Sequence, residues 1–402
     1  MDAARVTRHS YAMSQKPPTG PVPFTVAIPQ AKLDAIAARV RAYPWFPAPD
    51  DEGVAWARGV NTAFLRDLCA YWVDGYDWRA QEKALNHYPQ FVTRVSDIDL
   101  HYVHVVGEAK GKRPLILTHG WPGSHYEFWD AIDKLAFPSK HGGSAADAFD
   151  LVIPSLPGYG FSSKPARPMG QRATAKLFAT LMTDVLGYSS YLAQGGDWGS
   201  LVTSWLGVDG APQCRGIHLN MVPFRPNPPI PQNDTETAWL THMAAAMQAE
   251  GAYFQEQATK PQTLAHALMD SPVGAAAWIV EKFHGWSDLG AHGDILRVFS
   301  HDQLLTNVMI YLVTDSIATS VWYYRALFEE MAPLPAGTRC ETPTAIAHYP
   351  GERIFTAPPR SWVDRAYNVT RWIDMPDGGH FAAMEKPDAF VADLRAWARE
   401  LG

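Results

Sequence analysis

The chain has 402 residues, of which 47% are hydrophobic and 12% aromatic, and its net charge is −7. This length fits one large α/β domain with an inserted module better than two equal domains. The acidic balance and the lack of a long Lys/Arg run argue against nucleic acid as a partner. The sequence contains no apolar run of 18 residues, so no membrane span is predicted. Residues 1–22 are expected to be a polar, disordered lead-in without the apolar segment of a signal peptide.

The three cysteines, Cys69, Cys214 and Cys340, are widely spaced along the chain. They form neither a CxxC pair nor a His/Cys spacing that would bind a metal. We therefore expect reduced, buried thiols in a cytoplasmic protein and no metal site. No organic cofactor is expected either.

The N-terminal part of the chain, residues 23–97, is expected to be a meander that wraps around a larger unit. Residues 23–43 predict a short strand followed by an amphipathic helix, and the Trp-rich, Tyr-rich and Pro-rich sequence after them has only patchy helical periodicity. The following segment, IDLHYVHVV, alternates like an antiparallel strand. His101 and His104 are three apart in it and point to opposite faces, so a shared metal is not expected.

Strands then alternate with helices through residues 98–222, which predicts the first part of a mostly parallel, doubly wound sheet. A Pro-rich linker follows, and the sequence up to residue 331 is almost wholly helical in pattern. We predict that residues 223–335 form an all-helical cap. Strand patterns and a final helix return in residues 336–402, the second part of the core. The predicted fold class is α/β, with a helical cap inserted into the sheet domain.

The segment YLAQGGDWGSLVTSW reads as a strand, a tight turn and the start of a helix. Gly195 and Gly199 flank Asp197 with the spacing of the hydrolase nucleophile elbow G-x-S-x-G, but a carboxylate replaces the serine. The sequence has no G-x-S-x-G elsewhere. A carboxylate suits attack on a saturated carbon, in an epoxide or beside a halide, and forms an alkyl ester that activated water then hydrolyses.

The segment HGWPGS follows a predicted strand, where hydrolases of this kind place an oxyanion-hole donor. The backbone N–H groups of Trp121 and Trp198 are the two expected donors. Gly120 allows the backbone to approach a ligand closely, and Pro122 biases Trp121 toward an extended conformation. His119 is expected to be structural.

His380, in PDGGHFAAMEKP, lies on a loop after the last predicted strand, where this fold places its base. Glu352, in AHYPGERIF, ends the preceding strand and is the expected acid that orients and stabilises the imidazole. Asp364, Asp374 and Asp377 are alternatives for that acid.

Two tyrosines of the helical segment, Tyr253 and Tyr324, can donate a proton to an epoxide oxygen, and Tyr323 is a neighbouring alternative. An epoxide needs such an acid, whereas a halide leaves as a stable anion. A haloalkane-type dehalogenase with the same triad is therefore the alternative function. A ligand-binding protein without catalysis is a weaker one.

These motifs resemble those of the α/β-hydrolase-fold epoxide hydrolases, in the branch that contains the microsomal and juvenile-hormone enzymes. The resemblance runs from about Pro23 to the end of the chain. Its segments are HGWPGS, GGDWGS, TKPQTLAHALMDSPVGAAAWIVEKFHGW, LLTNVMIY and GGHFAAMEKP.

The resemblance implies hydrolysis of an epoxide to a vicinal diol. It assigns the nucleophile to Asp197, the base to His380, the acid to Glu352 and the two cap tyrosines to Tyr253 and Tyr324. Membrane-bound relatives carry an N-terminal apolar anchor that this sequence lacks, which implies a soluble, bacterial-type enzyme. An apolar or aryl epoxide substrate and a homodimer are further expectations.

Overall fold

The computed structural model describes residues 20–53, 55–109 and 113–402. Most of the predicted polar lead-in, residues 1–19, therefore lies outside the described residues. The described part contains a nine-stranded sheet with the order β1-β2-β3-β5-β4-β6-β7-β8-β9. The strands are β1 (Val22–Phe24), β2 (Gln90–Val95), β3 (Ile98–Val105), β4 (Arg113–Thr118), β5 (Phe149–Pro154), β6 (Tyr191–Gly195), β7 (Cys214–Leu219), β8 (Cys340–His348) and β9 (Tyr367–Asp374).

All neighbouring strands from β5 to β9 are parallel, whereas β1, β2 and β3 join the sheet in antiparallel pairs. The mostly parallel sheet predicted from the sequence is thus confirmed. The helices are α1 (Gln30–Arg41), α2 (Thr62–Asp74), α3 (Trp78–Leu85), α4 (Trp129–Ala136), α5 (Gln171–Thr180), α6 (Asp197–Asp209), α7 (Asp234–Glu250), α8 (Ala252–Thr259), α9 (Pro261–Asp270), α10 (Pro272–Trp286), α11 (His301–Val313), α12 (Ile317–Ser320), α13 (Trp322–Glu330), α14 (Arg360–Val363), α15 (Ala382–Glu385) and α16 (Pro387–Glu400).

Helices cover both faces of the central strands. Along β4, Leu115 and Leu117 pack into a buried cluster with α4 and α16, whereas Ile116 between them packs into the cluster that contains α5 and α6. This alternation is the period of two that a strand imposes on its side chains. Because both faces are buried, β4 and β5 are nearly continuous apolar runs.

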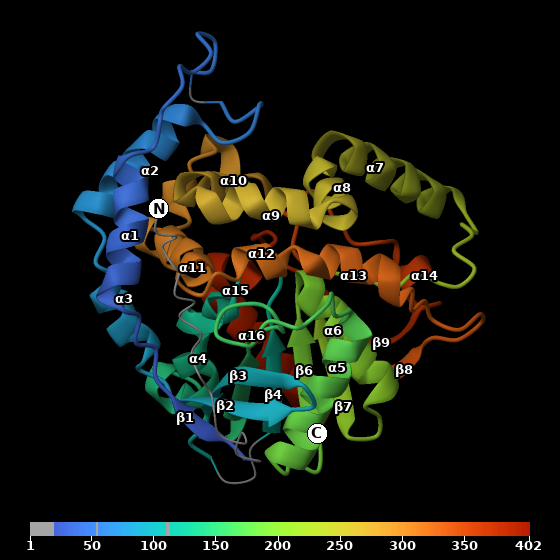
Figure 1. Cartoon of the computed structure of the whole chain (residues 1–402). Helices are drawn as coiled ribbons and strands as arrows, with labels where there is room; N and C mark the ends of the chain where they lie inside the picture. The colour runs from blue at the N-terminus through green and yellow to red at the C-terminus, as the bar shows by residue number, and fades with distance from the viewer. Residues whose placement is uncertain (1–19, 54, 110–112) are drawn as a thin grey trace.

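The helices α7 to α13 lie between β7 and β8 in the chain and stand over the carboxyl ends of the strands (Figure 1). Helix α11 is almost wholly buried and packs against α10. Among the residues that the structure describes, no single helix has the length and hydropathy to cross a membrane. Helix α11 and the helical stretch Ile317–Glu330, which meet at a 92° bend, reach that length and composition only together.

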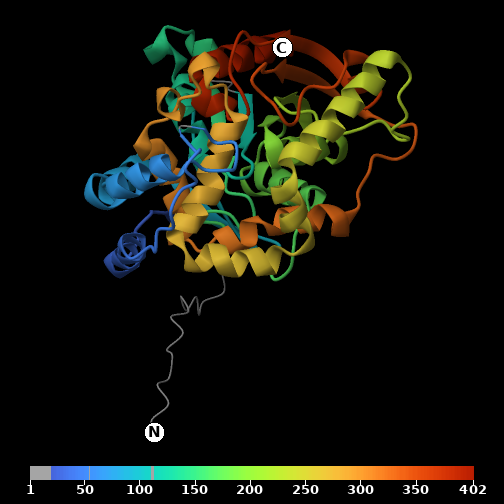
Figure 2. The same cartoon turned by 90° about the horizontal axis from the view of Figure 1, so that it is seen from above.

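The N-terminal segment contributes more regular structure than its sequence predicts. Strand β2, which the sequence analysis did not predict, pairs with β3 and carries β1 at the edge of the sheet. Its alternation covers only six residues, QFVTRV, so pairing with β3 decides the strand. Helices α1 and α2 lie beside α10 and α11 (Figures 1 and 2). The Tyr71 hydroxyl of α2 donates to Asp302 of α11 at 2.8 Å, which ties this segment to the helices over the sheet.

A very close approach joins the start of α6 to the end of β4. A Cβ on Gly199 would lie 1.9 Å from the Thr118 carbonyl oxygen, a contact that no side chain makes without moving the backbone. Glycine at this position is therefore a requirement of packing.

We expect the Gly199→Ala substitution to lower the free energy of unfolding by about 3 kcal/mol, because either α6 or β4 must shift. The matched control is Gly285→Ala, near the end of α10, where a Cβ would meet only the Glu281 carboxylate at 3.8 Å. That variant should stay within about 1 kcal/mol of the parent protein. Urea unfolding followed by circular dichroism measures both, and equal losses would contradict the packing argument.

Candidate active site

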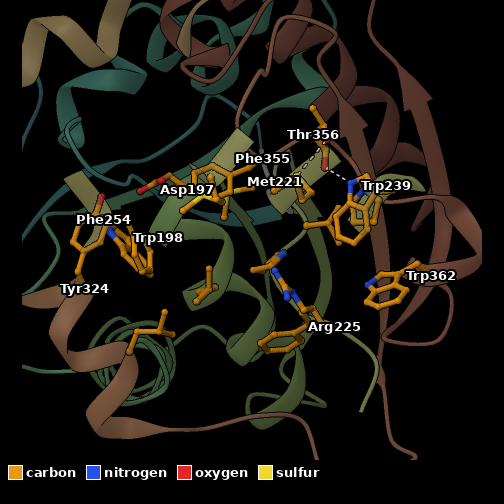
Figure 3. Close-up of a pocket in the computed structure, with 18 of the residues that line it drawn as sticks. Asp197, Trp198, Met221, Arg225, Trp239, Phe254, Tyr324, Phe355, Thr356 and Trp362 are labelled. Carbon is orange, nitrogen blue, oxygen red and sulfur yellow. Dashed lines mark hydrogen bonds between the residues drawn. The ribbon is translucent and has the colours of Figure 1, made fainter. Parts of the chain in front are cut away.

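Asp197 is the first residue of α6, directly after the turn that follows β6. Its φ is +47°, a left-handed conformation that non-glycine residues rarely adopt and that is typical of strained functional positions. A Cβ on Gly195 would lie 2.2 Å from the Gly199 carbonyl oxygen, so the turn closes only with glycine there. The helix N-terminus also favours the negative charge of the carboxylate. The sharp turn therefore projects the Asp197 side chain into the pocket (Figure 3).

The loop after β4 faces Asp197, as expected. The Trp121 backbone N–H donates to Asp197 Oδ1 at 2.8 Å. A Cβ on Gly120 would lie 2.3 Å from both Cβ and Oδ1 of Asp197, so this glycine makes the approach possible. Trp198 is the second residue of α6, and the N–H groups of a first helical turn have no acceptor within the helix. Trp121 thus brings a backbone donor to the carboxylate, and the Trp198 N–H follows Asp197 directly in the chain.

His119 is fixed by backbone groups on both sides of its ring. Its Nε2 accepts from the Leu156 N–H at 3.1 Å, and Nδ1 lies 3.0 Å from the Gly120 carbonyl oxygen. Burial lowers the pKa of His119 to about 4, so the ring is neutral at ordinary pH. These contacts agree with the structural role expected for His119.

Helix α11 holds the same loop from the other side. Asn307 Nδ2 donates to the Pro122 carbonyl oxygen at 2.7 Å, and the Tyr311 hydroxyl donates to the Gly123 carbonyl oxygen at 2.5 Å. The Ser124 hydroxyl completes the contact by donating to Asn307 Oδ1 at 3.0 Å. The sequence analysis predicts no role for Asn307 or Tyr311, although the segment LLTNVMIY, which contains both, carries part of the resemblance to the epoxide hydrolases. Two polar side chains four residues apart in an apolar helix are the signal that could have found them.

The imidazole of His380 connects two carboxylates. Its Nδ1 lies 2.6 Å from Glu352 Oε2, and its Nε2 lies 3.5 Å from Asp197 Oδ2. The other oxygen of Glu352 accepts the backbone N–H groups of Ile354 and Phe355, each at 3.1 Å. Asp197, His380 and Glu352 therefore form a continuous line of contacts, and both His380 and Glu352 are buried.

The three alternative acids pair with other residues. Asp364 accepts from Arg360 at 2.8 Å, Asp374 lies 3.0 Å from His348 Nδ1, and Asp377 accepts from Lys386 at 2.6 Å. The geometry thus brings Glu352, and none of these three, to His380.

Electrostatics couple the members of this line. Burial lowers the pKa of His380, but the Glu352 charge and the hydrogen bonds with Asp197 and Glu352 outweigh it and raise that pKa well above its ordinary value. Burial alone would raise the pKa of Glu352, yet the charge and hydrogen bond of His380 hold it below its usual value. The resting site therefore favours an imidazolium between two carboxylates.

Tyr253 on α8 and Tyr324 on α13 line the pocket together with Asp197, and their ring centroids are 5.8 Å apart. The Tyr253 ring stacks on Trp121 at 5.5 Å. The Tyr324 ring packs edge-on against Trp198 at 4.7 Å (Figure 3). Burial raises the pKa of both phenols well above the ordinary value, and the Asp197 charge adds to the effect. Both groups therefore keep their protons and can donate them to a bound oxygen.

Tyr323, the alternative to Tyr324, has a hydrogen-bond partner outside the pocket. Its hydroxyl lies 2.5 Å from the Thr174 hydroxyl on α5, and it is not among the residues that line the pocket. The structure thus separates the two neighbouring tyrosines by their surroundings.

Glu127 is a titratable group near the site that the sequence analysis did not consider. Its carboxylate lies over Gly123, where a Cβ would come within 1.5 Å of Oε1. Burial raises the pKa of Glu127 to about 8, the charge of His380 opposes that rise, and the charge of Asp197 adds to it. No pattern in the sequence marks this residue, because its position depends on a glycine four residues before it.

The pocket in front of Asp197 is a mainly apolar cavity of about 410 Å³ (Figure 3). Within the described ranges, no group of three or more His, Cys, Asp and Glu side chains is arranged to hold a metal ion. A carboxylate beside N–H donors, a histidine with an acid and two phenols on the opposite wall suit the opening of an epoxide ring and the hydrolysis of the resulting ester.

Comparison with known proteins agrees with this chemistry. The family described as "Epoxide hydrolase N terminus" matches residues 21–128, and the alpha/beta hydrolase fold family matches residues 113–269. Epoxide hydrolase 1 of Sus scrofa is 33% identical over 402 residues, covering 93% of this chain and 87% of that protein.

Two solved structures have the same architecture. The epoxide hydrolase of Aspergillus niger superposes with a TM-score of 0.82 at 31% identity, covering 95% of this chain and 97% of that one. The juvenile hormone epoxide hydrolase of Bombyx mori gives a TM-score of 0.82 at 31% identity, covering 96% and 95%. This chain therefore belongs to the epoxide hydrolases of the α/β-hydrolase fold, and its activity is the hydrolysis of an epoxide.

Proposed function

We propose that Asp197 of this epoxide hydrolase is the nucleophile that forms an ester with one carbon of the epoxide ring. The observation that carries the proposal is the position of the two Asp197 oxygens. Oδ1 accepts the Trp121 N–H, whereas Oδ2 faces His380 and can attack. As the new C–O bond forms, the ring C–O bond breaks, and the released oxygen takes a proton from Tyr253 or Tyr324.

In the second step, water attacks the ester carbonyl and His380 accepts its proton. The Trp121 and Trp198 N–H groups stabilise the oxyanion that forms on the former Asp197 carboxylate. Esterification removes the Asp197 charge, which is one cause of the raised pKa of His380, so that pKa falls. The imidazolium then gives its proton, through solvent, to the tyrosinate formed in the first step, and the neutral imidazole can accept the proton of the attacking water. The tetrahedral intermediate then collapses: the bond between the Asp197 carboxyl carbon and the substrate oxygen breaks, and that oxygen takes the proton from His380 to complete the diol. The proton of the re-formed Asp197 carboxyl returns to His380, so one water is added in total.

The substrate is proposed to be an apolar epoxide, since aromatic and aliphatic side chains make most of the pocket wall. Three buried, free thiols support the proposed cytoplasmic location. Residues 223–335 are proposed to act as a cap domain on the core formed by residues 98–222 and 336–402, with residues 23–97 as the N-terminal meander. It stays a prediction that the substrate carries an aryl group. It also stays a prediction that the enzyme forms a homodimer.

Labelling tests the ester route. In a single turnover with excess enzyme, an aryl epoxide and water enriched in oxygen-18, we expect the label in the peptide that contains Asp197 and a largely unlabelled diol. The Asp197→Ala variant should lose at least about 10⁴-fold in rate, because no other group replaces the nucleophile. Label in the first-turnover diol and none in Asp197 would mean direct attack by water.

The pH profile tests the role of Glu352. The rate of ester hydrolysis should rise with pH as His380 loses its proton. The Glu352→Gln variant removes a charge that raises the pKa of His380, so this rising limb should move to lower pH. The rate itself should fall by about 10²-fold or more, because the imidazole loses its orientation and charge partner. Asp364→Asn, at an exposed carboxylate paired with Arg360, is the control and should change neither property.

Paired tyrosine variants test the proton donors. Tyr324→Phe should slow ester formation by about 10²-fold, because the released oxygen loses one donor. Tyr323→Phe removes only the contact with Thr174 and should leave that rate within about twofold, with a stability loss of about 1 kcal/mol. Stopped-flow tryptophan fluorescence measures ester formation. Equal losses in both variants would contradict the assignment of Tyr324.

A further inference from the structure

The pocket extends well beyond the reacting groups. Asp197, Tyr253 and Tyr324 occupy one part of it, and the rest is an apolar arm. The walls of that arm include Met221, Met243, Met247, Trp239 and Trp362. Flexible methionine side chains and flat aromatic rings accommodate an extended hydrocarbon chain well. Figure 3 shows Trp239 and Trp362 on the side of the pocket away from Tyr324.

Among the described residues that line this cavity, Asp197 and Arg225 are the two charged ones. Arg225 belongs to the segment that follows β7, which leaves the sheet at the edge where Asp197 also lies. Its side chain is exposed and extends among the apolar side chains of the pocket (Figure 3). A guanidinium in an otherwise apolar wall is a specific feature, because a methionine or leucine would serve a purely apolar ligand equally well.

Within the described residues, Arg225 has neither an ion pair nor a hydrogen bond. Acidic groups on neighbouring elements already have partners. Glu330, which lies with Arg225 along an adjoining hollow, accepts the backbone N–H groups of Arg172 and Ala173. Glu236 pairs with Arg365 at 2.6 Å. The positive charge of Arg225 is therefore available to a ligand.

We propose that Arg225 binds the carboxylate of an elongated substrate, an acid with an apolar chain between its carboxylate and its epoxide. The inference rests on the proposed function, since it places the epoxide at Asp197. Arginine binds carboxylates through two parallel hydrogen bonds, and the apolar arm would hold the chain between the two ends. The overall charge of −7 disfavours anionic ligands, so a local cation at the pocket gives such a substrate its recognition.

The test compares 9,10-epoxyoctadecanoic acid with its methyl ester, both below their micelle concentrations. For each enzyme variant, kcat/KM of diol formation is measured for both compounds and expressed as the ratio of acid to ester. Arg225→Met keeps an unbranched, flexible side chain and removes its charge. We expect the acid-to-ester ratio to fall about tenfold in this variant, mainly through KM of the acid.

The control is Arg167→Met, at an exposed arginine that does not line the pocket. It makes the same change in net charge and should leave the ratio unchanged. The preference of the parent enzyme for the acid should also weaken at high salt, because an exposed ion pair is screened. Arg225→Lys should restore part of the ratio, since the charge returns without the two-bond geometry.

Two results would overturn the inference. The first is an acid-to-ester ratio that is the same in the parent enzyme and Arg225→Met. The second is an equal loss of the ratio in Arg167→Met, which would assign the effect to net charge. Failure of the proposed function looks different. In that case neither compound, nor the aryl epoxide of the labelling experiment, forms an ester on Asp197.

Discussion

The structure depends on one crowded point, where the first turn of α6 meets the end of β4. Asp197 takes a strained, left-handed conformation there, and three glycines leave no room for a Cβ against their neighbours. Gly195 and Gly199 close the turn against α6 and β4, and Gly120 lets the loop after β4 reach the carboxylate. The contacts that hold α6 against β4 therefore also position the Asp197 carboxylate. A substitution that alters this packing is expected to move the carboxylate as well.

The loop after β4 depends in turn on the helices that lie over the sheet. Asn307 and Tyr311 of α11 hold the carbonyl groups of that loop, and α11 is itself held by Tyr71 of α2. The N-terminal segment thus acts on the site at a distance, through one buried helix. The described part of the N-terminal segment contributes no side chain to the pocket, and its contact with α11 gives a physical reason for its presence: it positions the helix that positions the loop.

Much of this could be predicted from the sequence, because several features are local. The glycine spacing around Asp197, the HGWPGS loop and the position of His380 after the last strand each depend on a few neighbouring residues. The choice of Glu352 over Asp364 could not be made from spacing, since it depends on which carboxylate the fold brings to Nδ1. The separation of Tyr324 from Tyr323 likewise depends on α5, which offers Thr174 to one of them. Strand β2 was missed for the same reason, because its pairing with β3 is a tertiary contact. Glu127 lies against a glycine only four residues before it, but the burial that raises its pKa comes from the fold and has no sequence pattern.

A carboxylate nucleophile also changes what the histidine must do. In a serine elbow, the histidine has to be neutral at the start, since it removes the proton of the nucleophile. Asp197 has no proton to lose, so a resting imidazolium between Asp197 and Glu352 costs nothing in the first step and neutralises part of the buried charge. Once the ester forms, one of the two negative charges is gone and the pKa of His380 falls. The base is thus released by the chemistry of the first step, which orders the two half-reactions without a conformational change.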